Sequence, residues 1–319
     1  MNDMAQGRRR ELTADQQWEQ FSVLKTAEDY VESLRGRNLD VYFLGERLKE
    51  PVDHPIVRPS INAMAESYIL VNEDPDLATA WSTISEQQIN RFLHVPESAQ
   101  DLVQKNKMQR RMGQLTGTCF QRCAGLDTLS VLFSITYDID KKYGTPYHQR
   151  YVNFLKKAQT NNLIVGAGMT DPKGDRSKRP NDQADPDLFM HVTRRTDEGL
   201  YVKGAKAHMT GGLNSHWICV MPTMNMLEGD KDYAVIGMIP ATAPGLTYVY
   251  GRQSCDTRAL ETGDIDKGNA KYGGQETLVI FDDVFIPWEH VLMDGEYEFA
   301  QELVSRFTAY HRASYVCKT

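Results

Sequence analysis

Cysteine is scarce in this sequence, since only 5 of its 319 residues are cysteines. An odd, sparse and unevenly spaced set does not form the disulfide framework of a small extracellular domain, so a reduced, cytoplasmic setting is expected. No apolar run approaches the roughly 18 residues that a membrane-spanning helix requires, and the mean hydropathy is -0.50. Three arginines at positions 8–10 are not followed by the apolar stretch of a secretory signal.

An excess of basic residues is also missing. The chain has 36 Lys and Arg against 43 Asp and Glu, which gives a formal net charge of -7. Nucleic-acid binders usually carry a basic excess, so this class of partner is disfavoured. The composition, 41% hydrophobic and 25% charged, is that of a globular protein, and the length predicts about two domains.

The N-terminal region, residues 1–158, is predicted to be mostly helical. Thr26 is followed three residues later by Asp29, which is the pattern of a capping box at a helix start. A short β-type run over residues 41–47 interrupts the helical pattern. Further helices are expected over residues 60–70 and 82–92.

One long helix is predicted over residues 98–142. Its apolar residues recur at steps of three and four, which is the spacing of a buried helix face. The residues of this stripe are Met108, Met112, Leu115, Cys119, Cys123, Leu126, Leu129 and Phe133.

Residues 159–290 show short β-rich runs separated by turns. The turn residues Asp197, Glu198 and Gly199 separate two such runs and predict a hairpin. Further strands are expected at residues 217–221, 233–239, 246–250 and 276–281. Helical periodicity returns over residues 297–315, so residues 291–319 are interpreted as the start of a C-terminal helical domain that is incomplete at Thr319. The predicted class is α+β, with helices and strands segregated along the chain.

Two groups of residues could bind a metal. On a helix, Cys119 and Cys123 would share one face and could bind the same object, although cysteines on an apolar stripe also act as small core residues. Residues 311–318, His-Arg-Ala-Ser-Tyr-Val-Cys-Lys, supply an imidazole and a third thiol, unless they are scattered polar groups on a helix surface. Three thiolates and one imidazole can hold zinc or an iron–sulfur cluster, and the spacing alone does not distinguish them.

Two glycine-containing segments could contact a cofactor. Residues 166–177 combine glycines, which allow close approach of the backbone, with basic side chains suited to phosphate. They match neither a P-loop nor a dinucleotide fingerprint, and a solvated loop is the alternative interpretation. In residues 206–212, a His and a Thr precede two glycines, as in a ring-binding segment or a hairpin turn.

Taken together, these segments closely resemble the dehydratase branch of the 4-hydroxyphenylacetate 3-hydroxylase family of flavoproteins, over residues 26–319. The matching motifs are Cys119 to Cys123, Met169 to Arg176, His208 to Gly211 and His311 to Lys318, with residues 281–287 typical of the end of that family's β domain. The resemblance implies a fold like that of acyl-CoA dehydrogenases. It also implies a homotetramer, a dimer of dimers, that acts on an acyl-CoA substrate.

The resemblance further implies a role for individual residues. A [4Fe–4S] cluster would be bound by Cys119, Cys123, His311 and Cys317. FAD would be contacted by Met169, Thr170, Asp171, Pro172, Lys173, Gly174, Asp175, Arg176, His208, Met209 and Thr210. His311 and Tyr315 would move protons, supported by Gln121, Thr210, Glu276 and Lys318. One departure is that only Val316 separates Tyr315 from Cys317, where the family has two residues.

The implied reaction is the radical dehydration of 4-hydroxybutyryl-CoA to crotonyl-CoA, with a vinylacetyl-CoA Δ-isomerase activity left open. No carbonyl directly acidifies the C3 proton, and a flavin that takes and later returns one electron removes this obstacle. One alternative is a flavin-dependent aromatic hydroxylase resembling 4-hydroxyphenylacetate 3-monooxygenase, in which Arg and Tyr tend to replace the two cysteines. The other is an inactive, truncated scaffold.

Overall fold

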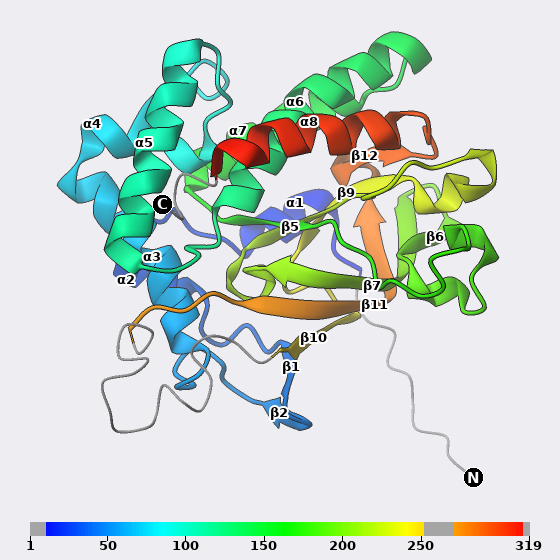
Figure 1. Ribbon diagram of the computed structural model, residues 1–319, viewed down its shortest axis with the longest axis horizontal. Helices are drawn as coiled ribbons and strands as arrows, with labels where there is room; N and C mark the ends of the chain where they lie inside the picture. Colours follow the sequence, from blue (N-terminus) through cyan, green and yellow to red (C-terminus); the bar gives the residue numbers. More distant parts are fainter. Residues whose placement is uncertain (1–10, 252–270, 315–319) are drawn as a thin grey trace.

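The computed structural model describes residues 11–251 and 271–314 of the chain (Figure 1). The α-helices are α1 (Ala14–Glu19), α2 (Ala27–Ser33), α3 (Arg58–Glu73), α4 (Pro75–Ala78), α5 (Ala99–Thr116), α6 (Cys123–Tyr143), α7 (Tyr147–Asn161) and α8 (Phe299–Ala313). The strands are β1 (Asp40–Phe43), β2 (Glu46–Leu48), β3 (Thr79–Ser82), β4 (Gln87–Asn90), β5 (Val165–Gly168), β6 (His191–Arg195), β7 (Gly199–Thr210), β8 (Trp217–Val220), β9 (Val235–Pro240), β10 (Leu246–Tyr250), β11 (Glu276–Pro287) and β12 (Val291–Asp294).

Local sequence signals explain several of these elements. The Thr26 side chain accepts a hydrogen bond from the Asp29 N–H, and the Asp29 carboxylate caps the Thr26 N–H in return, so the predicted capping box starts α2. The predicted hairpin is β6 and β7, and the other predicted strands correspond to β8, β9, β10 and β11. Within the described residues, the predicted C-terminal helix is α8.

Two secondary-structure predictions are wrong. Residues 82–92 form part of a hairpin, in which β3 pairs antiparallel with β4, followed by one turn of 3-10 helix. The long helix over residues 98–142 is two helices, because α5 ends where Gly117 adopts a left-handed conformation with φ 59°. Glycine adopts this conformation without steric cost, so it terminates a helix that apolar periodicity alone would continue.

The strands form two main sheets beneath a layer of helices. The larger sheet has the order β2-β1-β10-β11-β7-β6, and the smaller has the order β12-β9-β8-β5. Thus β1 and β2, from the mostly helical N-terminal region, complete the larger sheet, and β12, which follows residue 290, completes the smaller one. Helices and strands are therefore less strictly segregated than the sequence pattern suggests. The domain boundaries at residues 158 and 290 remain predictions.

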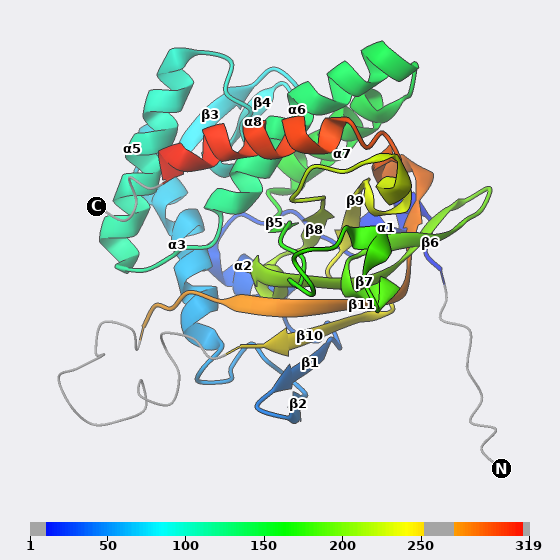
Figure 2. The same ribbon diagram turned by 45° about the vertical axis from the view of Figure 1, so that its right-hand side comes forward.

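Helices α6, α7 and α8 cross one side of the sheets, and α3 and α5 lie at one end, in both ribbon views (Figures 1 and 2). Helix α4 lies at the same end in Figure 1. Helix α8 packs along α6, which in turn contacts β5 of the smaller sheet. This arrangement brings the C-terminal part of the described chain over residues from its first half.

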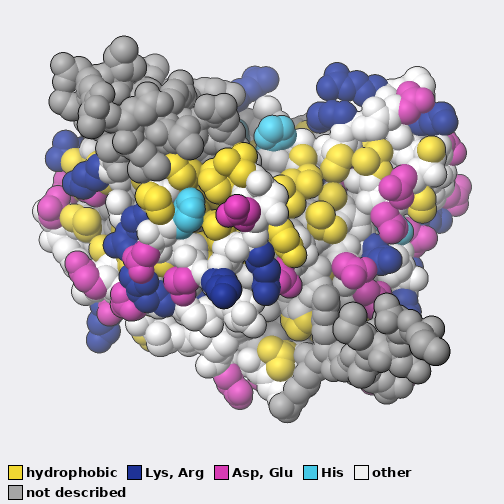
Figure 3. All heavy atoms as spheres, turned by 90° about the horizontal axis from the view of Figure 1, so that it is seen from below, with side chains coloured by type: hydrophobic (Ala, Val, Ile, Leu, Met, Phe, Trp, Pro, Cys, Tyr) yellow, Lys and Arg dark blue, Asp and Glu magenta, His cyan; other side chains and the backbone are white. Residues whose placement is uncertain are grey.

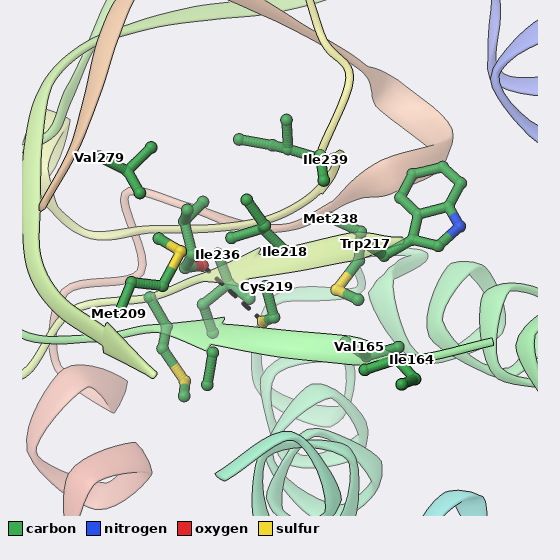
Figure 4. Packing of buried hydrophobic residues seen from close by; sticks show 14 of the residues in the cluster. Ile164, Val165, Met209, Trp217, Ile218, Cys219, Ile236, Met238, Ile239 and Val279 are labelled. Carbon is green, nitrogen blue, oxygen red and sulfur yellow. Dashed lines mark hydrogen bonds between the residues drawn. The ribbon is translucent and has the colours of Figure 1, made fainter. Parts of the chain in front are cut away.

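The main core lies between the two sheets and the helix layer. Figure 4 shows Met209 of the larger sheet pointing toward Ile236 of the smaller one, and both side chains are fully buried. Trp217 is also fully buried, with its ring centroid 4.6 Å from that of Trp18 and 5.1 Å from that of Phe154. Aromatic contacts of this kind contribute beyond simple area burial.

The underside of the molecule carries a band of apolar side chains between charged ones (Figure 3). Exposed apolar residues include Tyr42, Val249 and Ile280, each between 36% and 39% exposed, on three neighbouring strands of the larger sheet.

Among the described helices, none combines the length and the apolar character needed to cross a membrane.

Candidate functional site

A cavity of about 320 Å³ opens where the α5–α6 connection, α8 and three strands meet. Its lining combines two thiols, two imidazoles, a carboxyl group and short polar side chains. The lining residues are Cys119, Cys123, Ala124, Ala167, Met169, Thr170, His208, Thr210, Glu276, Phe307, His311 and Ser314. A larger, open hollow beside Gly295 is lined by none of the residues predicted for the site.

The two thiols reach the cavity by a route that the sequence analysis did not predict. Cys119 lies in the connection after α5, and Cys123 is the first residue of α6, so the two do not share a helix face. The prediction that Cys119 and Cys123 share a helix face is therefore wrong, although both cysteines line the same cavity. The connection folds back because Gly117 and Gln121 both take positive φ angles, of 59° and 66°.

Gln121 is part of the framework of this connection. Its amide nitrogen donates to the carbonyl oxygens of Ser60 at 2.9 Å and Gly273 at 3.1 Å, and its amide oxygen accepts from Asn214 at 3.4 Å. The side chain is 1% exposed, and Gln121 is not among the residues that line the cavity. The structure therefore places Gln121 behind the site, where it holds the Cys119–Cys123 connection in its strained conformation.

Strand β7 presents alternate residues to the cavity. His208 and Thr210 line it, whereas Met209 between them points into the core. This follows from the alternation of side chains along a strand. Of the three residues that the resemblance assigns to flavin contact here, only the two flanking ones offer side chains to the site.

Glu276 lies beside Thr210 on the paired strand β11. The Thr210 hydroxyl donates to the carboxylate, with distances of 2.8 and 3.0 Å to its two oxygens. Burial raises the pKa of the Glu276 carboxyl from 4.5 to about 7, the Thr210 hydrogen bond opposes this, and nearby Cys119 raises the pKa further. A carboxyl group with this pKa can both accept and donate a proton near neutral pH.

The predicted flavin segment over residues 169–176 divides into two parts. Met169 and Thr170 line the cavity, whereas residues 173–176 are exposed. Between them, Asp171 is 4% exposed, and its carboxylate lies 2.6 Å from the Nζ of Lys206, which is 2% exposed. Lys206 also donates to the carbonyl oxygens of Met169 at 3.0 Å and Met221 at 2.9 Å. The Asp171 side chain therefore helps to fix the start of this loop through Lys206.

His311 comes from α8 and is half-buried at the cavity wall. Its Nδ1 lies 2.9 Å from the Oδ2 of Asp127, and its ring stacks on Phe307 with a centroid distance of 5.2 Å. Sequence reasoning missed Asp127, together with its partners Lys105 and Ser314. One signal was present, since Asp127 is the only charged residue in the otherwise uncharged run of residues 123–136.

Tyr315, Cys317 and Lys318, which the resemblance assigns to the site, lie outside the described residues. Within residues 11–251 and 271–314, no three His, Cys, Asp or Glu side chains are grouped closely enough to hold a single metal ion. The donor atoms of Cys119, Cys123 and His311 are instead distributed around one cavity.

Comparison with known proteins identifies the family. The family model described as 4-hydroxyphenylacetate 3-hydroxylase N terminal matches residues 26–293. The chain belongs to this family. It is 52% identical, over 92% of its length, to the 4-hydroxybutyryl-CoA dehydratase/vinylacetyl-CoA Δ-isomerase of Clostridium aminobutyricum, and it covers 60% of that relative. The resemblance stated from the motifs is thereby confirmed.

Solved structures agree with this placement. An oxygen-tolerant archaeal 4-hydroxybutyryl-CoA dehydratase from N. maritimus superimposes with a TM-score of 0.90 at 60% identity, over 92% of this chain and 59% of that one. The oxygenase component of 4-hydroxyphenylacetate 3-monooxygenase, solved with FAD, superimposes with a TM-score of 0.74 at 21% identity, over 92% and 62% of the two chains. The second likeness shows a shared mixed helix and sheet fold. The chain spans about three fifths of the length of these relatives.

Proposed function

We propose that this chain contains the catalytic site of a 4-hydroxybutyryl-CoA dehydratase that forms crotonyl-CoA, uses FAD and a [4Fe–4S] cluster, and also isomerises vinylacetyl-CoA. The observation that carries the proposal is that one cavity collects the two thiols, the imidazole, the carboxyl group and four of the predicted flavin-contacting residues. Support also comes from two relatives of more than 50% identity that are named as dehydratases.

The donor set fits an iron–sulfur cluster better than a single ion. Thiolates and an imidazole are soft or borderline ligands of the kind that bind such clusters. In a four-iron cubane each ligand binds a different iron, so the ligands surround a volume and need not converge on a point. Cys119, Cys123 and His311 are arranged around a cavity in this way, and Cys317 is proposed as the fourth ligand.

The residues of the cavity can accept and donate protons. When bound, FAD supplies one-electron chemistry and the cluster supplies a Lewis acid for the leaving hydroxyl. Glu276, whose pKa is raised to about 7, can exchange a proton near neutral pH, and the Thr210 hydroxyl holds its carboxyl group in place. His311 and Tyr315 are proposed as the pair that moves the substrate protons, with Lys318 in support.

The loop before β6 and strand β7 are proposed to hold the flavin. Met169, Thr170, His208 and Thr210 line the cavity from two sides, so a ring system placed there would contact both segments. The buried Lys206–Asp171 pair keeps the first of these segments in place. We also propose a homotetramer, a dimer of dimers, which light scattering on the purified protein would test.

The test is anaerobic purification of the full-length protein, followed by cofactor analysis and assay. The proposal predicts a brown protein with about four irons per chain, bound FAD, and conversion of 4-hydroxybutyryl-CoA to crotonyl-CoA. A yellow, iron-free flavoprotein that hydroxylates a phenol would overturn it in favour of an aromatic hydroxylase. Replacing Tyr315 by Phe is expected to abolish turnover, and near wild-type turnover would refute the role of Tyr315.

A further inference from the structure

A single buried carboxylate joins the three helices that surround the thiol side of the cavity. Asp127 lies one turn after Cys123 on α6 and is fully buried. Its Oδ1 forms an ion pair with Lys105 of α5. Its Oδ2 lies 2.9 Å from the Nδ1 of His311 on α8, and it accepts a hydrogen bond of 2.9 Å from the Ser314 hydroxyl.

These contacts determine which ring nitrogen of His311 carries the proton. An ionised carboxylate can only accept hydrogen bonds, so the Nδ1 of His311 carries the proton in this contact. In the neutral ring, Nε2 is then the nitrogen with the lone pair. The ring plane is held by Phe307, which stacks on it at an interplanar angle of 19°. The tautomer and the orientation of the imidazole are therefore both set by residues outside the predicted ligand set.

Burying an ion pair between two helices is unfavourable by itself, because removing the charges from water costs several kcal/mol per ion. Apolar side chains of similar size would often hold α5 and α6 together equally well. The Lys105–Asp127 pair is only 2% and 0% exposed, and it lies directly behind the His311 side chain. A role toward His311 explains why a charged pair is placed at this point of the core.

We propose that Asp127 is a positioning residue that holds His311 with its Nε2 toward the cavity shared with Cys119 and Cys123, so that the imidazole is ready to bind iron. The inference rests on the proposed function, which places the cluster in this cavity. Carboxylates that accept a hydrogen bond from a ligating histidine typically change metal affinity about 10- to 100-fold when they are replaced. Lys105 and Ser314 hold the Asp127 carboxylate and act through it.

The test uses the full-length, cluster-containing protein and three variants. Asp127→Asn keeps a hydrogen-bond acceptor but removes the charge. The double variant K105M/D127L replaces the whole ion pair by apolar side chains, so that no unpaired charge stays buried. Asp138→Asn is the matched control, because Asp138 is also on α6 and binds Arg306 of α8 at 2.5 Å, but it does not line the cavity. Circular dichroism of each variant tests whether it is folded.

Two measurements decide the outcome, namely the rate of iron release to a chelator under anaerobic conditions and the EPR spectrum of the reduced cluster. We expect K105M/D127L to release iron at least about tenfold faster than wild type and to have an altered spectrum. Asp127→Asn should show a smaller change in the same direction, and Asp138→Asn should match wild type in both. A merely structural role of Asp127 would leave the EPR spectrum unchanged.

Wild-type behaviour of a folded K105M/D127L would overturn the inference and leave the proposed function intact. If Asp127→Asn does not fold, the iron release and the EPR spectrum of the double variant decide whether the inference holds. If the double variant also fails to fold, the pair serves folding and the positioning role is wrong. If the wild-type protein itself holds no iron, the proposed function fails, and the inference fails with it.

Discussion

The substitution Gly125→Ala tests whether the site requires the close contact between α6 and the smaller sheet. It lies two residues after Cys123, and a Cβ atom built on it would be 1.9 Å from the carbonyl oxygen of Val165 on β5. Real Cβ atoms essentially never come closer than 3.0 Å to a neighbour. The neighbour is backbone, which cannot rotate away, so Gly125→Ala must move α6 off β5 by about 1 Å.

The sign of the change in the free energy of unfolding shows whether close packing or helix propensity dominates at Gly125. In a helix interior, Gly→Ala alone would stabilise the protein by about 1 kcal/mol. A contact this short belongs at the upper end of the cost of overpacking, about 3 kcal/mol. The two terms leave a net loss of about 2 kcal/mol in the free energy of unfolding. In a chain of this size we expect the midpoint of thermal unfolding to fall by about 4 °C.

Thermal unfolding followed by circular dichroism measures this shift, with the iron content of the purified protein as a second readout. Gly144→Ala is the control, because it ends the same helix with φ 71° and has no atom within 4 Å of the added Cβ. It should cost about 1 kcal/mol through backbone strain alone and leave the iron content unchanged. A midpoint of Gly125→Ala at or above that of wild type would refute the close-packing argument.

Three further predictions concern the cavity and the core. Since the folded-state pKa of Glu276 is raised from 4.5 to about 7, the folded chain holds this proton more tightly than the unfolded chain, so stability should fall by about 3 kcal/mol as the pH rises from 4.5 to 7. In Glu276→Gln this part of the slope should disappear from urea titrations, and a slope equal to that of wild type would contradict the assignment. Lys206→Met leaves the buried Asp171 carboxylate without its cation, so we expect a loss of about 3 kcal/mol and weaker FAD binding in a fluorescence titration, which unchanged binding would refute. Trp217→Ala should cost about 3 to 5 kcal/mol and Trp217→Phe far less, because the indole N–H has no hydrogen-bond partner in the described part of the chain; equal costs would show that the contribution of Trp217 is not mainly packing.

The sequence predicted elements whose signals lie within a few residues of each other. The capping box at Thr26, the hairpin that turns at residues 197–199 and the apolar runs of the two sheets are local patterns, and the structure contains all of them. The prediction was wrong where apolar spacing indicated one structure and a single residue imposed another. Apolar spacing across Gly117 suggested one helix, although the conformation of a single glycine ends it there.

The motifs that resemble the family indicated which residues belong to the candidate site, but not which side chains face its cavity. The alternation along β7 sends Met209 into the core and leaves His208 and Thr210 at the cavity. Gln121 and Asp171 belong to the same motifs, yet both are buried behind the cavity, where they hold its segments in place. A motif shows which residues occur together, whereas the direction of each side chain depends on the element that carries it.

Only the tertiary structure brought Lys105, Asp127 and His311 together. They are separated by 22 and 184 positions in the sequence, and no local signal connects a lysine on α5 to a histidine on α8. Hydrogen bonds within a helix or a turn depend on neighbouring residues, so they can be anticipated from a short stretch of sequence. The contacts of a buried carboxylate depend on how separate helices pack, and that packing is set by the whole core at once.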